Sequence, residues 1–287
     1  MGMGIPDRIV KLDKAKIGSM TAKDGFINEN EICNKFKNYK TDKEANNWLS
    51  IMGYDPNKIQ ILVAVQIPVK INLLKAISFG VLAEKYEETI KFQKADIQIK
   101  IEIIFEGVLY VENISLKKAN ISSGFNQVDK RPVLAYMKMW GFSEEIANLL
   151  RLFTGELSPE NILSNKEFGK IKDKRRLFLN EMPLEKQNII IKYFKNNKTL
   201  IVSDILRGRG GLSVEWLLVT RRGSDGSIDF VLKDINTVCN FYAQGEVAIT
   251  DRGNLRIGRV TMQRKGGTPD PTSLQFKINP LKLFGET

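Results

Sequence analysis

The sequence predicts a mixed α/β protein with a central mixed sheet flanked by helices and a strand-rich, basic C-terminal half. Three observations support this class. Residues 28–39 place apolar side chains at helical spacing, whereas residues 96–103 alternate isoleucine with polar side chains. From residue 199 onward, short apolar runs recur between turn residues, which is typical of strands. No repeat or Pro/Ser-rich linker divides the 287 residues, so we expect one compact unit.

The N-terminal part is expected to be mostly helical. After the helix over 28–39, Thr41-Asp-Lys-Glu44 has a capping-box pattern that opens a second helix. A strand is expected over 61–67. A further helix is expected over 70–91, although Gly80 falls inside it.

A hairpin follows in the sequence. The alternating run over 96–103 precedes Glu106-Gly107, and residues 108–117 form a second run that suits its antiparallel partner. Beyond it we expect a helix from Ser143 to Thr154, and another that begins at Pro183 and ends at Asn196-Asn197. The strands expected in the remainder span 199–207, 213–221, 228–233, 246–250, 255–264 and 274–278.

The charge and the missing residue types limit the function. Forty-four Lys and Arg against 33 Asp and Glu leave a net charge of +11, which favours a polyanionic partner, nucleic acid first. With no histidine, the chain cannot use a Ser-His-Asp or Cys-His relay or an imidazole metal ligand. The 2 cysteines are too few for a four-cysteine zinc site and suit a reducing compartment. No signal-peptide core is visible, so we expect a cytoplasmic protein.

Candidate catalytic residues lie on the predicted hairpin. If Glu106-Gly107 is a two-residue turn, Asp96 lies opposite Lys117, and strand alternation places Ser115 on the same face. A carboxylate can hold Mg²⁺ beside a scissile phosphate, and an ammonium can orient water or the phosphate. The alternative is an ordinary surface ion pair across two strands, worth less than ~1 kcal/mol.

A resemblance favours the catalytic interpretation. The spacing Asp96…Ser115-Leu-Lys117 resembles the D-x(n)-(D/E/Q/N)-x-K motif of PD-(D/E)xK endonucleases. Other segments resemble, in the same order, the family of GCGC-cutting type II restriction endonucleases: Thr21-Ala-Lys-Asp-Gly-Phe, Gly124-Phe-Asn-Gln-Val-Asp-Lys130, Phe153-Thr-Gly-Glu-Leu157, Lys172-Asp-Lys-Arg-Arg176, Asp204-Ile-Leu-Arg-Gly-Arg-Gly210 and Gly258-Arg-Val-Thr-Met-Gln-Arg-Lys-Gly-Gly267.

This resemblance implies a restriction-endonuclease-like core, Mg²⁺ as the cofactor, and Asp96 and Lys117 as the catalytic pair. Two departures from the family stand out. Residues 69–93 are an expected insertion, and Ser115 occupies a position that is glutamine in the family, so a metal-binding carbonyl is replaced by a hydroxyl. Glu29, on the first predicted helix, is a candidate second metal ligand beside Asp96. Its alternative is a solvated acid that favours the helix dipole.

Candidate DNA-binding residues lie in four basic or polar segments. Resemblance implies that Gln263, Arg264 and Lys265 contact the target, and arginine, lysine and glutamine have the geometry to read base edges. Asn126 and Gln127 are expected in a short polar loop that also carries Lys130; the alternative is a solvated loop. Other candidates, which need only charge to contact phosphates, are Arg207, Arg209, Arg259 and the segment 172–176.

The sequence therefore predicts a Mg²⁺-dependent type II restriction endonuclease that cuts both strands of double-stranded DNA at a short target with GC half-sites. We expect a single domain over 1–287, in which 1–120 supplies mainly catalytic elements and 121–287 mainly recognition elements. Paired protomers or a homodimer on a two-fold symmetric target, and a cognate DNA methyltransferase, are the expected partners. Two alternatives are a DNA-binding or nicking subunit with a weakened active site, which Ser115 motivates, and a basic nucleic-acid-binding structural protein.

Overall fold

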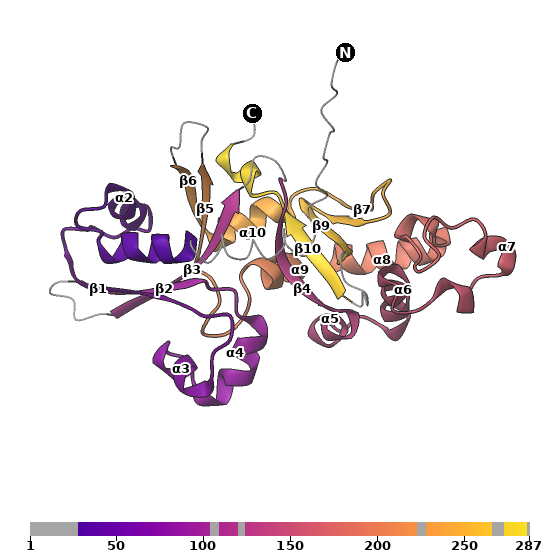
Figure 1. Ribbon diagram of the computed structural model, residues 1–287, viewed down its shortest axis with the longest axis horizontal. Coiled ribbons are helices and arrows are strands. Elements are labelled where there is room, and N and C mark those ends of the chain that lie inside the picture. Colours follow the sequence, from indigo (N-terminus) through magenta and orange to yellow (C-terminus); the bar gives the residue numbers. More distant parts are fainter. Residues whose placement is uncertain (1–27, 104–108, 120–123, 223–227, 266–272, 286–287) are drawn as a thin grey trace, which may run out of the picture.

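The structure, a computed structural model, describes residues 28–103, 109–119, 124–222, 228–265 and 273–285. Two five-stranded sheets lie next to each other along the long axis of the molecule (Figure 1). The helices α9 (Lys198–Leu206) and α10 (Ile235–Ala243) lie between them: they pack on each other, α9 also contacts β4 (Asn126–Pro132), and α10 contacts β5 (Trp216–Arg222). This confirms the mixed α/β class.

The first sheet has the strand order β1-β2-β3-β5-β6. The pairing of β3 with β5 is parallel, and the other pairings are antiparallel, so the sheet is mixed as expected. It takes two of its strands from the second half of the chain. The remaining bounds are β1 (Ile59–Gln66), β2 (Ile97–Ile103), β3 (Leu109–Ala119) and β6 (Ile228–Asp234).

The predicted hairpin is present, but its register was wrong by two residues. Ile97 pairs with Ile114 and Gln98 with Asn113, so Asp96 lies opposite Ser115 and not opposite Lys117. Register in a half-buried sheet is set by which side chains are buried. A shift of two residues leaves every side chain on its original face, so Lys117 stays on the face of Asp96. The Glu106-Gly107 turn from which the register was inferred lies outside the described residues.

Alternation along the hairpin separates an apolar face from a polar one. The side chains of Ile97, Ile99, Ile114 and Leu116 are buried in one cluster with the helix over 28–37 and α2 (Lys43–Ile51). Burial of each such side chain stabilises the fold by about 1.5–3 kcal/mol. The helix α2 begins after the N-cap Asp42, whose carboxylate accepts hydrogen bonds from two backbone amides of the first turn. A Thr41-x-x-Glu44 capping box would place the N-cap at Thr41, so the helix begins one residue later than this pattern predicts.

The second sheet is antiparallel throughout, in the order β4-β10-β9-β8-β7. Residues 126–127 belong to its strand β4, so the expected loop at this position was wrong. Tyr136 and Trp140 of α5 pack their rings against Phe276 of β10 and hold the helix on the sheet. The other strands are β7 (Val247–Ile249), β8 (Leu255–Ile257), β9 (Val260–Arg264) and β10 (Ser273–Ile278), and the helices at this end are α5 (Val133–Trp140), α6 (Glu144–Thr154), α7 (Asn165–Phe168) and α8 (Leu184–Asn196).

Two further helices, α6 and α9, test the elements expected from the sequence. The helix α6 begins after the N-cap Ser143 and ends at Gly155 in the left-handed region, as predicted. The expected strand over 199–207 was wrong, because this segment is α9, whose Ile201, Val202 and Ile205 are buried between the sheets. A run of β-branched residues fits a buried helix as well as a strand, and tertiary packing decides. The helices α5 and α10 were not expected.

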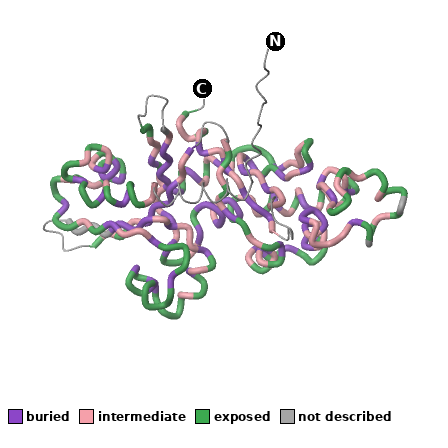
Figure 2. The backbone as a smooth tube through the Cα atoms, viewed as in Figure 1, coloured by how far each residue is buried: buried purple, intermediate pink, exposed green. Residues whose placement is uncertain are grey.

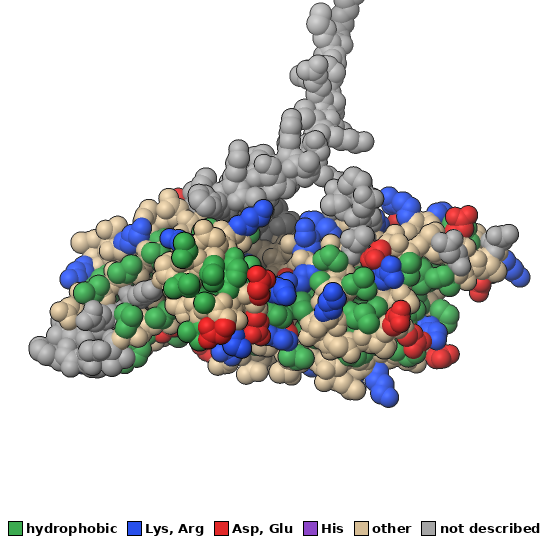
Figure 3. All heavy atoms as spheres, turned by 90° about the horizontal axis from the view of Figure 1, so that it is seen from below, with side chains coloured by type: hydrophobic (Ala, Val, Ile, Leu, Met, Phe, Trp, Pro, Cys, Tyr) green, Lys and Arg blue, Asp and Glu red, His purple; other side chains and the backbone are tan. Residues whose placement is uncertain are grey.

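The segment around residues 69–93 forms a protruding unit below the first sheet (Figure 1). The single helix expected over 70–91 was wrong: Gly80, with φ of 89°, separates α3 (Leu73–Ser78) from α4 (Tyr86–Phe92), which follows a short 3₁₀ turn. Apolar side chains remain on its surface, with Val69 91%, Leu74 78% and Leu82 62% exposed. Figure 3 shows apolar side chains on the face on which this segment lies.

Burial is concentrated in the strands and in the helices between the two sheets, whereas α2, α3, α4 and α7 present their outer faces to solvent (Figure 2). Both described cysteines, Cys33 and Cys239, are unpaired thiols. In the described part of the chain, none of the helices has the length and apolar character needed to span a bilayer.

Candidate functional site

Three polar side chains converge at one end of the paired strands β2 and β3, in the interior of the first sheet. Asp96 immediately precedes β2, and Ser115 and Lys117 alternate along β3, so all three share a face. The Asp96 carboxylate oxygen Oδ2 accepts hydrogen bonds from the Ser115 hydroxyl, at 3.0 Å, and from the Leu116 backbone amide, at 2.6 Å. Its position is therefore fixed by two donors of the neighbouring strand.

Ser115 connects the other two groups. Its Oγ donates to Asp96 and accepts a hydrogen bond of 3.1 Å from the Lys117 ammonium. Lys117 Nζ also donates to the Leu116 carbonyl, at 2.8 Å, and lies 3.7 Å from Asp96 Oδ2. The Ser115 residue is 4% exposed, whereas the side chains of Asp96 and Lys117 are 27% and 20% exposed. The Asp96 carboxylate and the Lys117 ammonium are thus partly exposed to solvent, whereas the Ser115 hydroxyl that bonds both is buried.

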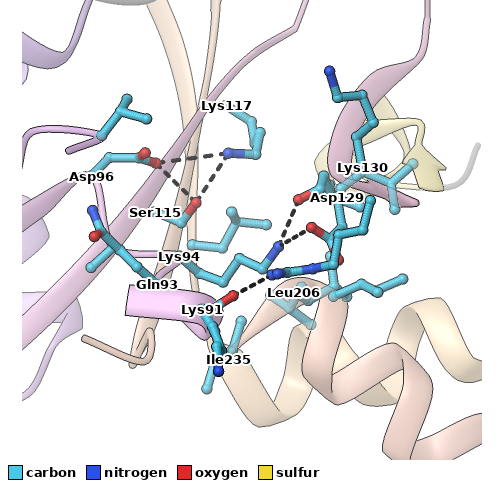
Figure 4. A pocket seen from close by; sticks show the side chains of 18 of the residues that line it. Lys91, Gln93, Lys94, Asp96, Ser115, Lys117, Asp129, Lys130, Leu206 and Ile235 are labelled. Carbon is cyan, nitrogen blue, oxygen red and sulfur yellow. Dashed lines mark hydrogen bonds and ion pairs between the residues drawn. The ribbon is translucent and has the colours of Figure 1, made fainter. Parts of the chain in front are cut away.

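These groups line a pocket of about 360 Å³. Figure 4 shows Asp96, Ser115 and Lys117 on one side and the β4 residues Asp129 and Lys130 on the other, with Lys94 between them. The pocket therefore lies where the two sheets approach each other. It is wide enough for a substrate group, and the carboxylate and ammonium of the first sheet point toward it.

Glu29 lies near this pocket, at the start of the helix over 28–37. Its carboxylate accepts a hydrogen bond of 2.7 Å from the Gln66 side chain at the end of β1. Burial raises the pKa of Glu29, and the nearby negative charge of Asp96 raises it further, while Gln66 and Lys117 act in the opposite direction. Asp96 and Lys117 are thus close enough to Glu29 to influence its charge state.

The donor set fits a hard divalent cation. Mg²⁺ is usually held by one or two carboxylates together with water and substrate phosphate oxygens. Asp96 supplies one carboxylate in the pocket, and Glu29 supplies a second that lies near enough to Asp96 to be affected by its charge. In the described residues no cluster of three or more His, Cys, Asp or Glu forms a metal cage. A site completed by substrate and water is consistent with this finding.

The arginines at the two ends of β9, Arg259 just before it and Arg264 at its last position, contact neighbouring side chains. Arg264 is 11% exposed at its side chain and lies 3.7 Å from the Asp173 carboxylate, which also binds Arg175 and Arg176. Arg259 lies over the Phe241 ring at 4.0 Å and donates to the Gln244 side chain. The segment 172–176 therefore packs against the strand that carries Arg264.

Gln263 and Lys265, on either side of Arg264, have different surroundings. Gln263 lines a second pocket of about 550 Å³, together with Arg252, Asn254 and Lys277. Lys265 is half-buried, and its positive charge lowers the pKa of Lys277 in addition to the larger effect of burial. Lys265 and Lys277 therefore lie near each other at β9 and β10.

The strand β4 presents alternating polar side chains. Gln127 and Lys130 are exposed, and Lys130 lines the pocket that contains Asp96. Asn126 donates a hydrogen bond to the Lys118 carbonyl of β3, so it stabilises the passage from the first sheet to the second. Of the three predicted residues, Gln127 and Lys130 are the ones positioned for an external partner.

The two arginines of the glycine-rich loop after α9 differ. Arg207 is exposed, whereas Arg209 forms a two-point contact with the buried Asp204 carboxylate and lies over the Phe92 ring at 4.5 Å. Gly208, with φ of 77°, is needed at the turn because a Cβ there would lie 2.0 Å from the Phe92 carbonyl oxygen. The loop is therefore fastened to the segment that leads to Asp96.

The sequence reasoning missed a buried polar cluster beside the pocket. Asp129 of β4 is ion-paired with Lys94 and Arg131, and its pKa, which burial alone would raise, is held below its usual value by these two cations. The available signals were the position of Lys94 two residues before Asp96 and the charged run Asp129-Lys130-Arg131. Their contact depends on the approach of the two sheets, which no local pattern reveals.

The comparison with solved structures shows the fold. The crystal structure of the restriction endonuclease MspI in complex with its cognate DNA superposes with a TM-score of 0.58, covering 93% of this chain and 94% of that one at 14% sequence identity. At this identity the similarity establishes the fold, which is that of a restriction endonuclease.

The family follows from the sequence comparison. Residues 82–284 match the family model of the R.HinP1I restriction endonuclease, and the chain belongs to this family. It is therefore a type II restriction endonuclease, a site-specific deoxyribonuclease that acts on double-stranded DNA. No curated protein sequence matches the chain. The family match begins at residue 82, after the end of α3.

Proposed function

We propose that this endonuclease hydrolyses both strands of a short DNA target containing GC half-sites, in a Mg²⁺-dependent reaction in which Asp96 and Lys117 are the catalytic pair. The observation that carries the proposal is the hydrogen-bonded array of Asp96, Ser115 and Lys117 at the edge of a pocket between the two sheets. A carboxylate and an ammonium held 3.7 Å apart can serve one phosphodiester together.

Each residue has a role that follows from its chemistry. Asp96 and Glu29 would hold Mg²⁺, which when bound stabilises negative charge on the phosphate and lowers the pKa of a coordinated water. The Lys117 ammonium orients the attacking water and offsets charge that develops on the scissile phosphate. Ser115 keeps Asp96 and Lys117 in place, because its hydroxyl bonds both.

Recognition falls to the second sheet in this proposal. Gln127 on β4 and Gln263 and Arg264 on β9 are the side chains we assign to base edges, and Asn126 supports β4. Lys130, Arg207 and Lys265 are assigned to phosphates. Arg209 and Arg259 are assigned mainly to supporting the fold, because their guanidinium groups lie against Asp204 and Gln244.

We further propose that the whole chain, 1–287, acts as one endonuclease domain, with catalytic groups mainly in 1–120 and recognition groups mainly in 121–287. Two protomers would meet on a target with two-fold symmetry, each cutting one strand, and a cognate DNA methyltransferase would protect the host's own sites. The two departures from the family, Ser115 and the segment 69–93, are reasons to expect a target that differs from GCGC, such as one with a spacer base pair.

A second candidate rests on Ser115. A hydroxyl at this position offers no amide carbonyl to a metal, which favours a nicking enzyme or a DNA-binding subunit of a restriction system over full double-strand cleavage. The difference between the two functions is measurable on circular DNA.

The test is incubation of the purified protein with supercoiled plasmid in Mg²⁺, with EDTA and Ca²⁺ as parallel conditions. Discrete fragments in Mg²⁺ alone, with a common sequence at their ends, support the proposal and identify the target. Nicked circles support the nicking enzyme. Unchanged supercoils together with a specific gel shift support the DNA-binding subunit and contradict the cleavage proposal.

A further inference from the structure

A buried ion pair joins the segment that leads into β2 to the recognition strand β4. Lys94 Nζ lies 3.0 Å from Asp129 Oδ1 and donates to the Val128 carbonyl at 3.1 Å. The two side chains are 10% and 7% exposed. Removal of one partner from such a pair leaves an uncompensated buried charge, so the contact resists separation.

Asp129 is fastened on its second oxygen as well. Oδ2 accepts hydrogen bonds of 3.1 Å from Arg131 Nε and 3.1 Å from the Tyr136 hydroxyl on α5. Arg131 in turn donates to the Lys91 carbonyl. The strand β4 therefore holds the chain just before β2 at two points, through Lys94 and through Lys91.

The held segment is short and ends at the candidate catalytic carboxylate. Lys94 is separated from Asp96 by one residue, Ala95, whose backbone amide bonds the Leu212 carbonyl at 3.3 Å, and the Asp96 amide bonds the Ile114 carbonyl. Figure 4 shows the Lys94 side chain extending from this segment to Asp129, beneath the pocket that Asp96 lines. A displacement of β4 would therefore reach Asp96 through very few bonds.

We propose that Lys94 and Asp129 are positioning residues that couple contact of β4 with DNA to the placement of Asp96. The strand β4 also presents Gln127 and Lys130 outward. DNA that fits these side chains sets the position of β4, and the ion pair passes that position to Asp96. The inference rests on the proposed function and adds how correct recognition is converted into cleavage.

The test compares Asp129→Asn with the unaltered protein on two duplexes: the target identified by plasmid cleavage, and the same duplex with one base pair changed. Binding is measured by gel shift in Ca²⁺ and cleavage by single-turnover kinetics in Mg²⁺. We expect binding of the target to stay within ~3-fold while its cleavage slows ~30-fold, with a smaller loss on the altered duplex. Asp129→Glu should recover part of the rate.

Two further variants separate coupling from folding. Glu156→Gln removes an acid from another ion pair, with Arg151, far along the chain from Asp96, and should leave both rates unchanged. If Asp129→Asn does not fold, the double variant Lys94→Met with Asp129→Leu removes both charges of the pair, which buried sites tolerate better than the loss of one partner. In this variant the partly exposed Arg131 loses its contact with Asp129 but keeps its bond to the Lys91 carbonyl. In this double variant too, we expect cleavage of the target to slow more than cleavage of the altered duplex.

The outcomes are distinct. Unchanged cleavage of the target by the folded variants overturns the inference. An equal loss of cleavage rate on both duplexes, matched by weaker binding, also overturns it, because that pattern reflects a structural role. If the unaltered protein cuts and Asp129→Asn cuts equally well, the proposed function stands without this inference. Absence of cleavage by the unaltered protein overturns both.

Discussion

The two sheets differ in how their functional side chains are held. In the first sheet, Asp96, Ser115 and Lys117 satisfy one another through short hydrogen bonds on adjacent strands. In the second sheet, Arg264 forms an ion pair with Asp173, which belongs to a loop distant in the sequence. Gln127 extends from β4 into solvent. Groups proposed for catalysis are thus preorganised by regular structure, whereas groups proposed for recognition depend on neighbours that DNA can replace.

The physical cause of this difference lies in the strands. The apolar face of the first sheet is buried under the helix over 28–37 and α2, which fixes the register of β2 and β3. Catalytic groups on such strands need no rearrangement. A surface that reads DNA must instead present polar groups to a partner, as Gln127 does from the edge strand β4.

The largest effect is expected from the first sheet. Asp96→Ala and Lys117→Ala should each lower the rate of DNA cleavage roughly 1000-fold or more, because each removes a group that contacts the metal or the phosphate. Specific binding in Ca²⁺, measured by gel shift, should persist. Cleavage by either variant at the rate of the unaltered protein would contradict the assignment of the site.

A smaller effect is expected from Glu29→Gln, which keeps the bond to Gln66 but removes the negative charge. We expect cleavage to slow ~100-fold at low Mg²⁺ and to recover partly as Mg²⁺ is raised, because one of two carboxylate ligands is weakened. Titration of the cleavage rate with Mg²⁺ measures this. An unchanged Mg²⁺ requirement would return Glu29 to the role of a solvated helix-start acid.

Ser115→Ala should cost less than loss of either group that it connects. Hydrogen bonds to charged groups contribute about 1.5–3 kcal/mol each, so we expect cleavage to slow ~10- to 100-fold. Ser115→Thr, which keeps the hydroxyl, is the matched control. Single-turnover cleavage compares the two, and equal rates for both variants would show that the hydroxyl does not organise the site.

In the second sheet, Arg264→Ala and Lys265→Ala should differ in kind. Arg264→Ala removes a bidentate base contact and should reduce discrimination against a single wrong base pair by ~1–3 kcal/mol. Lys265→Ala removes a phosphate contact and should weaken binding to all sequences and lower the salt dependence of binding. Binding to matched and mismatched duplexes over a range of salt concentrations tests both. A uniform loss for Arg264→Ala would assign it to the phosphates.

The smallest effect concerns stability beneath the first sheet. Burial raises the pKa of Glu215 to about 7, against a bond from the Asn113 amide that lowers it. Between pH 4.5, its ordinary pKa, and about 7, the folded protein binds more protons at this carboxyl than the unfolded chain does, so stability falls as pH rises.

Glu215→Gln removes this dependence. The difference in unfolding free energy between the unaltered protein and Glu215→Gln should change by up to about 2 kcal/mol across that window, after allowance for partial exposure of the group. Urea denaturation at pH 5 and pH 8 measures it. A difference that is constant between the two pH values would contradict the shifted pKa.

Much of the local structure followed from the residues alone. The period-two isoleucines of β2, the N-cap Ser143 of α6 and the turn at Gly155 behave as their local chemistry requires, because each depends on contacts within a few residues. The face shared by Asp96 and Lys117 followed for the same reason, since alternation along a strand survives a register shift of two.

The tertiary structure decided the rest. The segment 198–206 became the helix α9, although its apolar side chains, buried from both sides, show neither the helical nor the strand period. The tertiary structure also set the register that places Asp96 opposite Ser115. It also brought Lys94 to Asp129 and Arg264 to Asp173, pairs far apart in the chain. Residue types and spacing therefore determined the chemistry available to this protein, whereas the packing of its two sheets decided which groups meet, because long-range contacts depend on burial that no local segment contains.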